Sequence, residues 1–86
     1  MDLFVSGFPL DLDEAKLIKL FEIYGIIVKS AKIIKDHSTG FSKGFGIVTI
    51  EDNEAAERAI SKLDGESIEG SKLTVKEASL LHLFYK

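Results

Sequence analysis

The hydrophobic pattern of this chain switches between a period of two residues and a period of three to four. Segments of period two, which are typical of half-buried strands, lie at 2–6, 27–35, 43–50 and 72–76. Segments with apolar residues three and four positions apart, which are typical of helices, follow Asp13 and follow Asp52 or Asn53. Gly25 ends the first of these helices and Gly65 closes the second. The pattern therefore predicts the order β-α-β-β-α-β.

This order predicts an α+β, ferredoxin-like fold, in which a four-stranded antiparallel sheet carries both helices on one face. The other face is then open, and the alternation of side chains along each strand assigns its residues. Val48 and Ile50 are expected in the core, and Gly46 is expected to let a helix approach closely. The side chains expected on the open face are Phe4, Ser6, Lys32, Ile34, Lys43, Phe45, Ile47, Thr49, Lys72, Thr74 and Lys76.

The predicted open face combines aromatic rings with lysines. The net charge of −3 argues mildly against an indiscriminate nucleic-acid binder. Most of the acidic residues, however, are expected on the two helices and in the turn after the second, which leaves the sheet basic. Bases stack on flat rings for about 1–3 kcal/mol each and ammonium groups meet phosphates, so the face has the chemistry of a single-strand binder.

Two motifs then carry a family resemblance. The stretch KGFGIVTI at 43–50 resembles the longer ribonucleoprotein octamer of the RNA-recognition motif, and LFVSGF at 3–8 resembles the shorter hexamer of its first strand. Both motifs lie inside the expected element order, and the resemblance covers residues 2–78. It implies an RNA-recognition domain at 1–78, followed by an apolar C-terminal extension at 79–86.

In that family Phe4 and Phe45 would each stack a base, and Lys43 would meet a backbone phosphate. Gly44 and Gly46 would supply strand flexibility and close packing beside the stacking ring. Phe41, in the loop before the motif, could clamp a base at the sheet edge or fold back on its own loop. The residues expected to contact single-stranded RNA are Phe4, Ser6, Lys32, Phe41, Lys43, Phe45, Ile47, Lys72, Thr74 and Lys76.

The chain departs from the family pattern at three places. Ile47 stands where the octamer usually has a third aromatic ring, which predicts weaker binding or a weaker base preference. Gly7 replaces the asparagine that is usual in the hexamer. The segment from 25 to 36 is one residue longer than usual, and a β-bulge in the second strand is one explanation.

Two other classes of function are found on folds of this kind. A protein-interaction module would use the sheet face and the apolar tail for a peptide or for a second copy of the chain. An acylphosphatase-like enzyme on the same fold would need an arginine and an asparagine around a phosphate after the first strand. That loop reads GFPLDL and the one arginine is Arg58, so no enzyme is expected.

Neither a cofactor nor a metal ion is expected. The chain has no cysteine, and His37 and His82 lack a carboxylate at ligand spacing, so they are taken as turn and tail residues.

The tail at 79–86 is the feature that the domain does not need. Its apolar residues could cover the sheet, pack at a helix edge or pair with a second copy. Contact with the sheet or with a neighbour is expected, and self-association is one outcome. The start MDLFVSG lacks the pattern of a signal peptide. A domain of this length resembles small one-domain bacterial RNA-binding proteins and is expected in the cytoplasm, or in the nucleus if it comes from a eukaryote.

Overall fold

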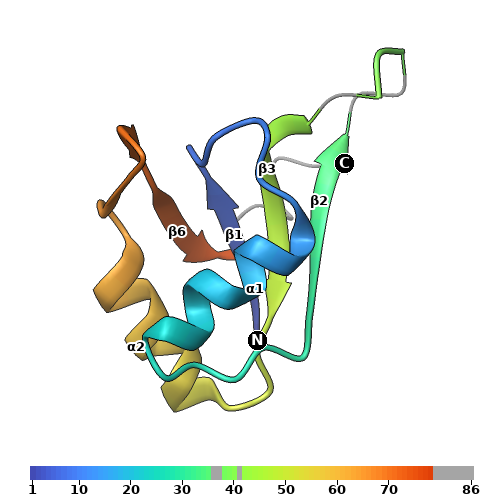
Figure 1. Cartoon of the computed structure of the whole chain (residues 1–86). Helices are drawn as coiled ribbons and strands as arrows, with labels where there is room; N and C mark the ends of the chain where they lie inside the picture. Colours follow the sequence, from blue (N-terminus) through green and yellow to red (C-terminus); the bar gives the residue numbers. More distant parts are fainter. Residues whose placement is uncertain (36–37, 41, 79–86) are drawn as a thin grey trace.

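The fold is a four-stranded antiparallel sheet with two helices packed on one side, as the computed structural model in Figure 1 shows. The structure describes residues 1–35, 38–40 and 42–78, without the side chains of residues 42 and 43. The sheet order is β2-β3-β1-β6, and β4 and β5 form a separate hairpin. The elements are β1 (Asp2–Ser6), α1 (Glu14–Ile23), β2 (Ser30–Lys35), β3 (Ser42–Thr49), α2 (Asn53–Leu63), β4 (Ser67–Ile68), β5 (Ser71–Lys72) and β6 (Thr74–Glu77). The predicted α+β, ferredoxin-like architecture is confirmed.

The core lies between the helices and the inner face of the sheet. Alternate strand residues point inward, and Leu3, Val5, Val48 and Val75 among them are fully buried. The helices meet them with Leu17 and Phe21 from α1 and with Ala56, Ala59 and Leu63 from α2. Removal of this apolar surface from water is the main force that holds the helices on the sheet. No helix in the described part of the chain is long and apolar enough to cross a membrane.

Both helices begin and end where the sequence predicts. The Asp13 carboxylate accepts a hydrogen bond of 2.8 Å from the Lys16 backbone N–H, and the Asp52 carboxylate accepts one of 3.1 Å from that of Glu54. Each cap satisfies a backbone donor that has no partner inside the helix. Gly25 follows α1 with a φ of 77°, the left-handed conformation in which glycine avoids steric strain.

The predicted last strand begins too early. Lys72 belongs to β5 and pairs with Ser67 in the short hairpin, so it does not lie on the four-stranded sheet. The backbone N–H of Leu73 donates to the carbonyl of Glu66, and only from Thr74 does the chain join β1. Strands of two residues are too short to show a period, which explains why the sequence pattern did not reveal this hairpin.

The predicted irregularity of the sheet is present, but its extra residues lie in β3 and not in β2. Ile33 pairs with Gly46, whereas Lys35 pairs with Ser42, so one residue of β2 faces three residues of β3. Gly44 lies among those three with a φ of 81°. A glycine at such a bulge gives the strand a local turn without strain from a side chain.

The close neighbour of Gly46 also differs from the expectation. A Cβ on Gly46 would lie 2.5 Å from the carbonyl oxygen of Lys32 and 3.2 Å from the Cα of Ile33. The backbone that comes close is therefore the adjacent strand β2, not a helix. Together with the bulge at Gly44, this explains why two glycines interrupt an otherwise regular strand.

Replacement of Gly7 by alanine should destabilise the fold more than replacement of Gly25. Both glycines have a positive φ, but a Cβ on Gly7 would overlap the carbonyl oxygen of Lys72, whereas a Cβ on Gly25 meets nothing within 4 Å. Gly25→Ala should cost about 1–2 kcal/mol for the backbone conformation alone. Gly7→Ala should cost about 1–3 kcal/mol more because of the overlap. Urea unfolding of both variants measures the difference, and equal losses would show that the close approach at Gly7 is unimportant.

Candidate nucleic-acid interface

Two rows of side chains cross the middle of the open face of the sheet. The strand register places four residues in the first row and three in the second. The first row is Lys32, Ile47, Phe4 and Lys76, and the second is Phe45, Ser6 and Thr74. Because Leu3, Val5 and Val48 are buried on the other face, the outward direction predicted for these seven residues is confirmed.

An aromatic pair lies near the centre of this face. The rings of Phe4 on β1 and Phe45 on β3 have centroids 5.5 Å apart and are tilted by 41°. Both side chains are half-buried, since the open side of the sheet leaves part of each ring accessible. Diagonal neighbours on adjacent strands can reach this distance, and tilted pairs are a favourable aromatic geometry. The pair therefore presents two ring surfaces from two strands at one place.

Ile47 extends the apolar centre but adds no ring. It lies directly opposite Phe4 on one side and Lys32 on the other, and its side chain is half-buried. An aliphatic side chain here can contact a sugar or the edge of a base, but it has no flat π-surface on which a base could stack.

A carboxylate also lies on this face, which the sequence analysis did not identify. Asp2 is two residues before Phe4 on β1, and its Oδ1 accepts a 2.8 Å hydrogen bond from the Thr49 hydroxyl. Asp2 and Thr49 are partners in the strand register. The described face is thus basic at both ends of the first row but acidic where β1 begins.

Lys76, at the β6 end of the first row, has a partner from the end of α2. Its Nζ lies 2.9 Å from Oδ2 of Asp64, and the other carboxylate oxygen of Asp64 accepts a 3.0 Å hydrogen bond from the Val75 N–H. The hydrogen bond from Lys76 lowers the pKa of Asp64 most, followed by the bond from Val75, and the charge of Lys72 contributes least. An acidic group therefore meets a lysine that the sequence assigned to RNA.

The opposite edge of the sheet has a similar cap. The Glu14 carboxylate, in the first turn of α1, accepts a 3.3 Å hydrogen bond from the Ile33 N–H of edge strand β2. Glu14 and Ile33 are 19 positions apart in the sequence, and Asp64 and Val75 are 11 positions apart. No local sequence pattern signals them, which is why both were missed.

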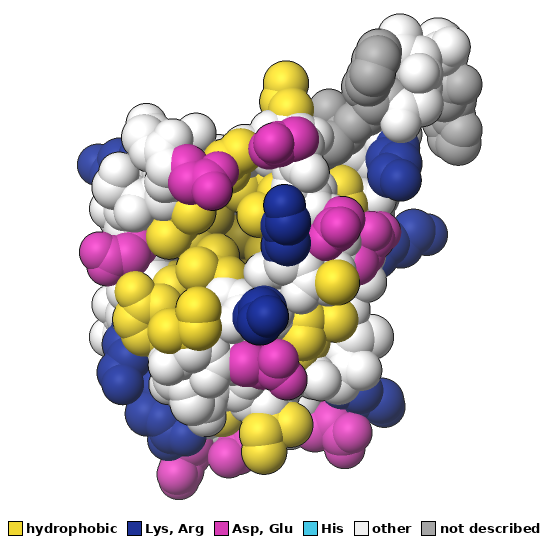
Figure 2. All heavy atoms as spheres, in the orientation of Figure 1, with side chains coloured by type: hydrophobic (Ala, Val, Ile, Leu, Met, Phe, Trp, Pro, Cys, Tyr) yellow, Lys and Arg dark blue, Asp and Glu magenta, His cyan; other side chains and the backbone are white. Residues whose placement is uncertain are grey.

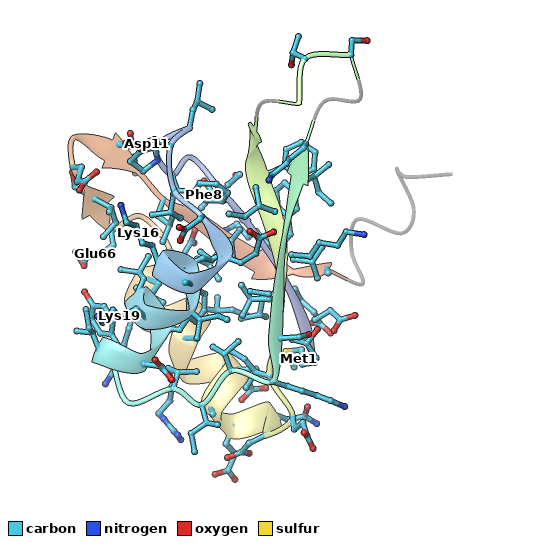
Figure 3. The ribbon with its side chains drawn as sticks, turned by 45° about the vertical axis from the view of Figure 1, so that its right-hand side comes forward. Met1, Phe8, Asp11, Lys16, Lys19 and Glu66 are labelled. Atoms are coloured by element: carbon cyan, nitrogen blue, oxygen red, sulfur yellow. The ribbon has the colours of Figure 1, made fainter. Side chains whose placement is uncertain are left out.

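The helical side is of mixed charge and not acidic as predicted. Each helix contains two acidic and two basic residues, and the acidic excess lies at the caps and in the turns. Figure 2, which views this side, shows acidic and basic groups interspersed around apolar atoms. Lys16 and Lys19 lie here on α1 (Figure 3). The four sheet strands, by contrast, contain four lysines and two acids.

Three other residues predicted to contact RNA, Phe41, Lys43 and Lys72, do not belong to the two rows. Phe41 and the side chain of Lys43 lie outside the described residues. Lys72 is exposed in the β4–β5 hairpin, where its Cε would lie 3.9 Å from a Cβ at Gly65. Ile34, half-buried, faces the irregular part of β3.

Within the described residues, no group of three or more His, Cys, Asp or Glu side chains is placed to hold a metal ion.

The family model described as RNA recognition motif matches residues 3–74. The chain belongs to this family. The match covers both motifs, both helices and strands β2 and β3, and it ends at Thr74, the first residue of β6.

Relatives and solved structures agree with this assignment. Small RNA binding protein 1 of Cucumis sativus is 44% identical over 75 residues, which are 87% of this chain and 46% of the relative. The chloroplastic 28 kDa ribonucleoprotein of Spinacia oleracea is 40% identical over 90% of this chain and 33% of the relative. The chain thus spans less than half the length of either protein.

Two solved structures have the same fold. RNA binding protein PG1 superposes with a TM-score of 0.83 at 42% identity, over 91% of this chain and 93% of that one. A complex of the Sxl-lethal protein with RNA superposes with a TM-score of 0.81 at 30% identity, over 90% of this chain and 46% of that one.

The pKa of Asp64 should rise when its lysine partner is removed. In the native protein the Asp64 carboxyl should titrate below its ordinary value of 3.8, and Lys76→Ala should move it up more than Lys72→Ala does. Because the folded pKa is lowered, the carboxylate adds stability above the unfolded pKa, and this stability is lost as pH falls through the folded pKa. Carbon-detected NMR titration measures each value, and an unchanged pKa in Lys76→Ala would contradict the pairing.

Proposed function

We propose that this chain binds short single-stranded RNA across the open face of its sheet. The observation that carries the proposal is the Phe4–Phe45 pair, with centroids 5.5 Å apart, on a face that no helix covers within the described residues. Stacked bases would lie on these two rings, and Ile47 would contact the nucleotide between Phe4 and Lys32. The names of the relatives, and the RNA complex among the structural neighbours, support the same activity.

The polar members of the two rows take the remaining roles in this proposal. Lys32 and Lys76 lie at opposite ends of the first row, where their ammonium groups can meet phosphates on either side of the stacked bases. Ser6 and Thr74 supply hydroxyl groups beside Phe45 that can donate to or accept from base edges. Lys43 is proposed to meet a phosphate on the strength of the motif alone. Phe41, in the loop before the motif, is proposed to clamp a base at the sheet edge.

Binding without catalysis is the activity that we propose. The protein-interaction alternative is not favoured, because the relatives are named for binding RNA. Self-association through residues 79–86 stays a prediction, since the tail lies outside the described residues. For the location, the chloroplastic ribonucleoprotein among the relatives widens the expected compartments beyond the cytoplasm and nucleus.

Phe45→Ala should weaken the binding of single-stranded RNA by about 1–3 kcal/mol, the worth of one stacked base. Because Phe45 is half-buried and packs on Phe4, the variant should also lose about 0.5–1.5 kcal/mol of stability, yet remain folded. Fluorescence anisotropy with labelled oligonucleotides measures the affinity. Ile27→Ala is the control, since Ile27 is 84% exposed and lies outside the sheet. Equal affinity of the two variants for RNA would exclude the aromatic pair as the binding platform.

Ile47→Phe should tighten binding, because a ring beside Phe4 adds a third stacking surface to the first row. The expected gain is again about 1–3 kcal/mol if one further base stacks. Ile27→Phe makes the same change at an exposed position off the sheet and should leave affinity unchanged. A similar gain in both variants would indicate general hydrophobic attraction and not a site on the sheet.

A further inference from the structure

A carboxylate pairs with the lysine at the β6 end of the first row. Asp64 follows α2 and lies beside the outer edge of β6, where one oxygen accepts from the Val75 N–H and the other from Lys76 Nζ. The bond to Val75 fixes the carboxylate against the strand, so its contact with Lys76 does not depend on two mobile side chains meeting. The side chains are 55% exposed for Lys76 and 32% exposed for Asp64, so an external anion can reach the pair.

Lys76 is at the same time part of the binding face. It lies opposite Phe4 in the row that also contains Ile47 and Lys32. An ammonium group favours a carboxylate and a phosphate for the same reason, since both are anionic oxygen acceptors. A phosphate that approaches Lys76 therefore meets a competing acceptor and a repulsive charge. Among the described residues, no carboxylate forms a hydrogen bond or an ion pair with Lys32.

We propose that Asp64 is a built-in competitor that limits phosphate binding by Lys76 at the β6 edge of the face. RNA gains the contact with Lys76 only when the ammonium group exchanges Asp64 for phosphate, while Asp64 stays bonded to Val75. Lys72 adds a second positive charge near this turn, since its Cε lies 3.9 Å from where a Cβ on Gly65 would be, next to Asp64. Without the carboxylate, the β6 edge would present two lysines to the RNA backbone. The inference rests on the proposed function and deepens it.

Asp64→Asn separates the two roles of the side chain. The asparagine side-chain oxygen can still accept from the Val75 N–H, but it has no charge with which to hold Lys76. Binding of labelled single-stranded RNA should tighten about two- to fivefold at low salt, which corresponds to the strength of an exposed ion pair. The plot of log affinity against log salt should become steeper by about 0.7, the value for one more neutralised phosphate on a single strand.

Glu14→Gln is the matched control. Glu14 also accepts from an edge-strand N–H, at Ile33, and the change removes the same single negative charge. Glutamine keeps an oxygen for Ile33, and the substitution releases no sheet lysine from an ion pair given by the structure. Affinity and salt slope should therefore stay close to those of the native protein. Thermal unfolding of both variants verifies that the edges remain intact.

Three results would overturn the inference. Equal tightening in Asp64→Asn and Glu14→Gln would show that net charge alone is responsible, and weaker binding in Asp64→Asn would show that Asp64 assists RNA binding. Tightening that persists when Lys76→Ala is added to Asp64→Asn would show that Lys76 is not the group released. In each case the proposed function stands if the native protein binds single-stranded RNA and Phe45→Ala weakens that binding. If the native protein binds no single-stranded RNA, the proposed function and the inference are both overturned.

Discussion

The pairing of β1 with β3 is the constraint on which the open face depends. Their register places Leu3 opposite Val48 in the core and Phe4 opposite Ile47 on the outside. A slip of one residue would turn the phenylalanine toward the helices and the leucine toward water, because side chains alternate strictly along a strand. Burial of the inner residues against α1 and α2 makes that slip costly. The core therefore holds the aromatic pair in place, although neither ring belongs to it.

Strand β3 makes close backbone contacts with elements on both of its sides. At Gly46 the backbone of β2 comes so close that a Cβ would lie 2.5 Å from the carbonyl oxygen of Lys32. At Gly44 the strand bulges, and its carbonyl accepts a 3.0 Å hydrogen bond from the Gly7 N–H in the loop after β1. Glycine weakens a strand intrinsically. Here Gly44 and Gly46 allow close backbone contacts on either side of Phe45. The strand is thus intrinsically less stable at the position that holds this ring.

Sequence periodicity predicted the long elements, their order and the outward face, because hydrophobic alternation directly reports which side of a strand is buried. The capped ends of α1 and α2 were predictable for a similar local reason, since Asp13, Asp52 and Gly25 act on backbone groups a few residues away. Contacts that depend on the folded chain were not predictable. Lys72 belongs to the β4–β5 hairpin, whose strands are too short to show a hydrophobic period. Asp64 contacts Lys76 across the segment that connects α2 to β6.

The placement of the acidic residues explains how a chain of net charge −3 can have a basic row of side chains on its open face. Both edge strands of the open sheet have backbone N–H groups directed away from it, and such groups invite pairing with other chains. Carboxylates from the helices accept from two of these groups, Glu14 on β2 and Asp64 on β6. The two acids thus lie at the rim, while Lys32 and Lys76 remain in the row that contains Phe4. The local placement of charges, and not their sum, determines what a surface attracts. Because Glu14 and Asp64 protect the sheet edges, they also bring negative charge to the boundary of the proposed RNA site.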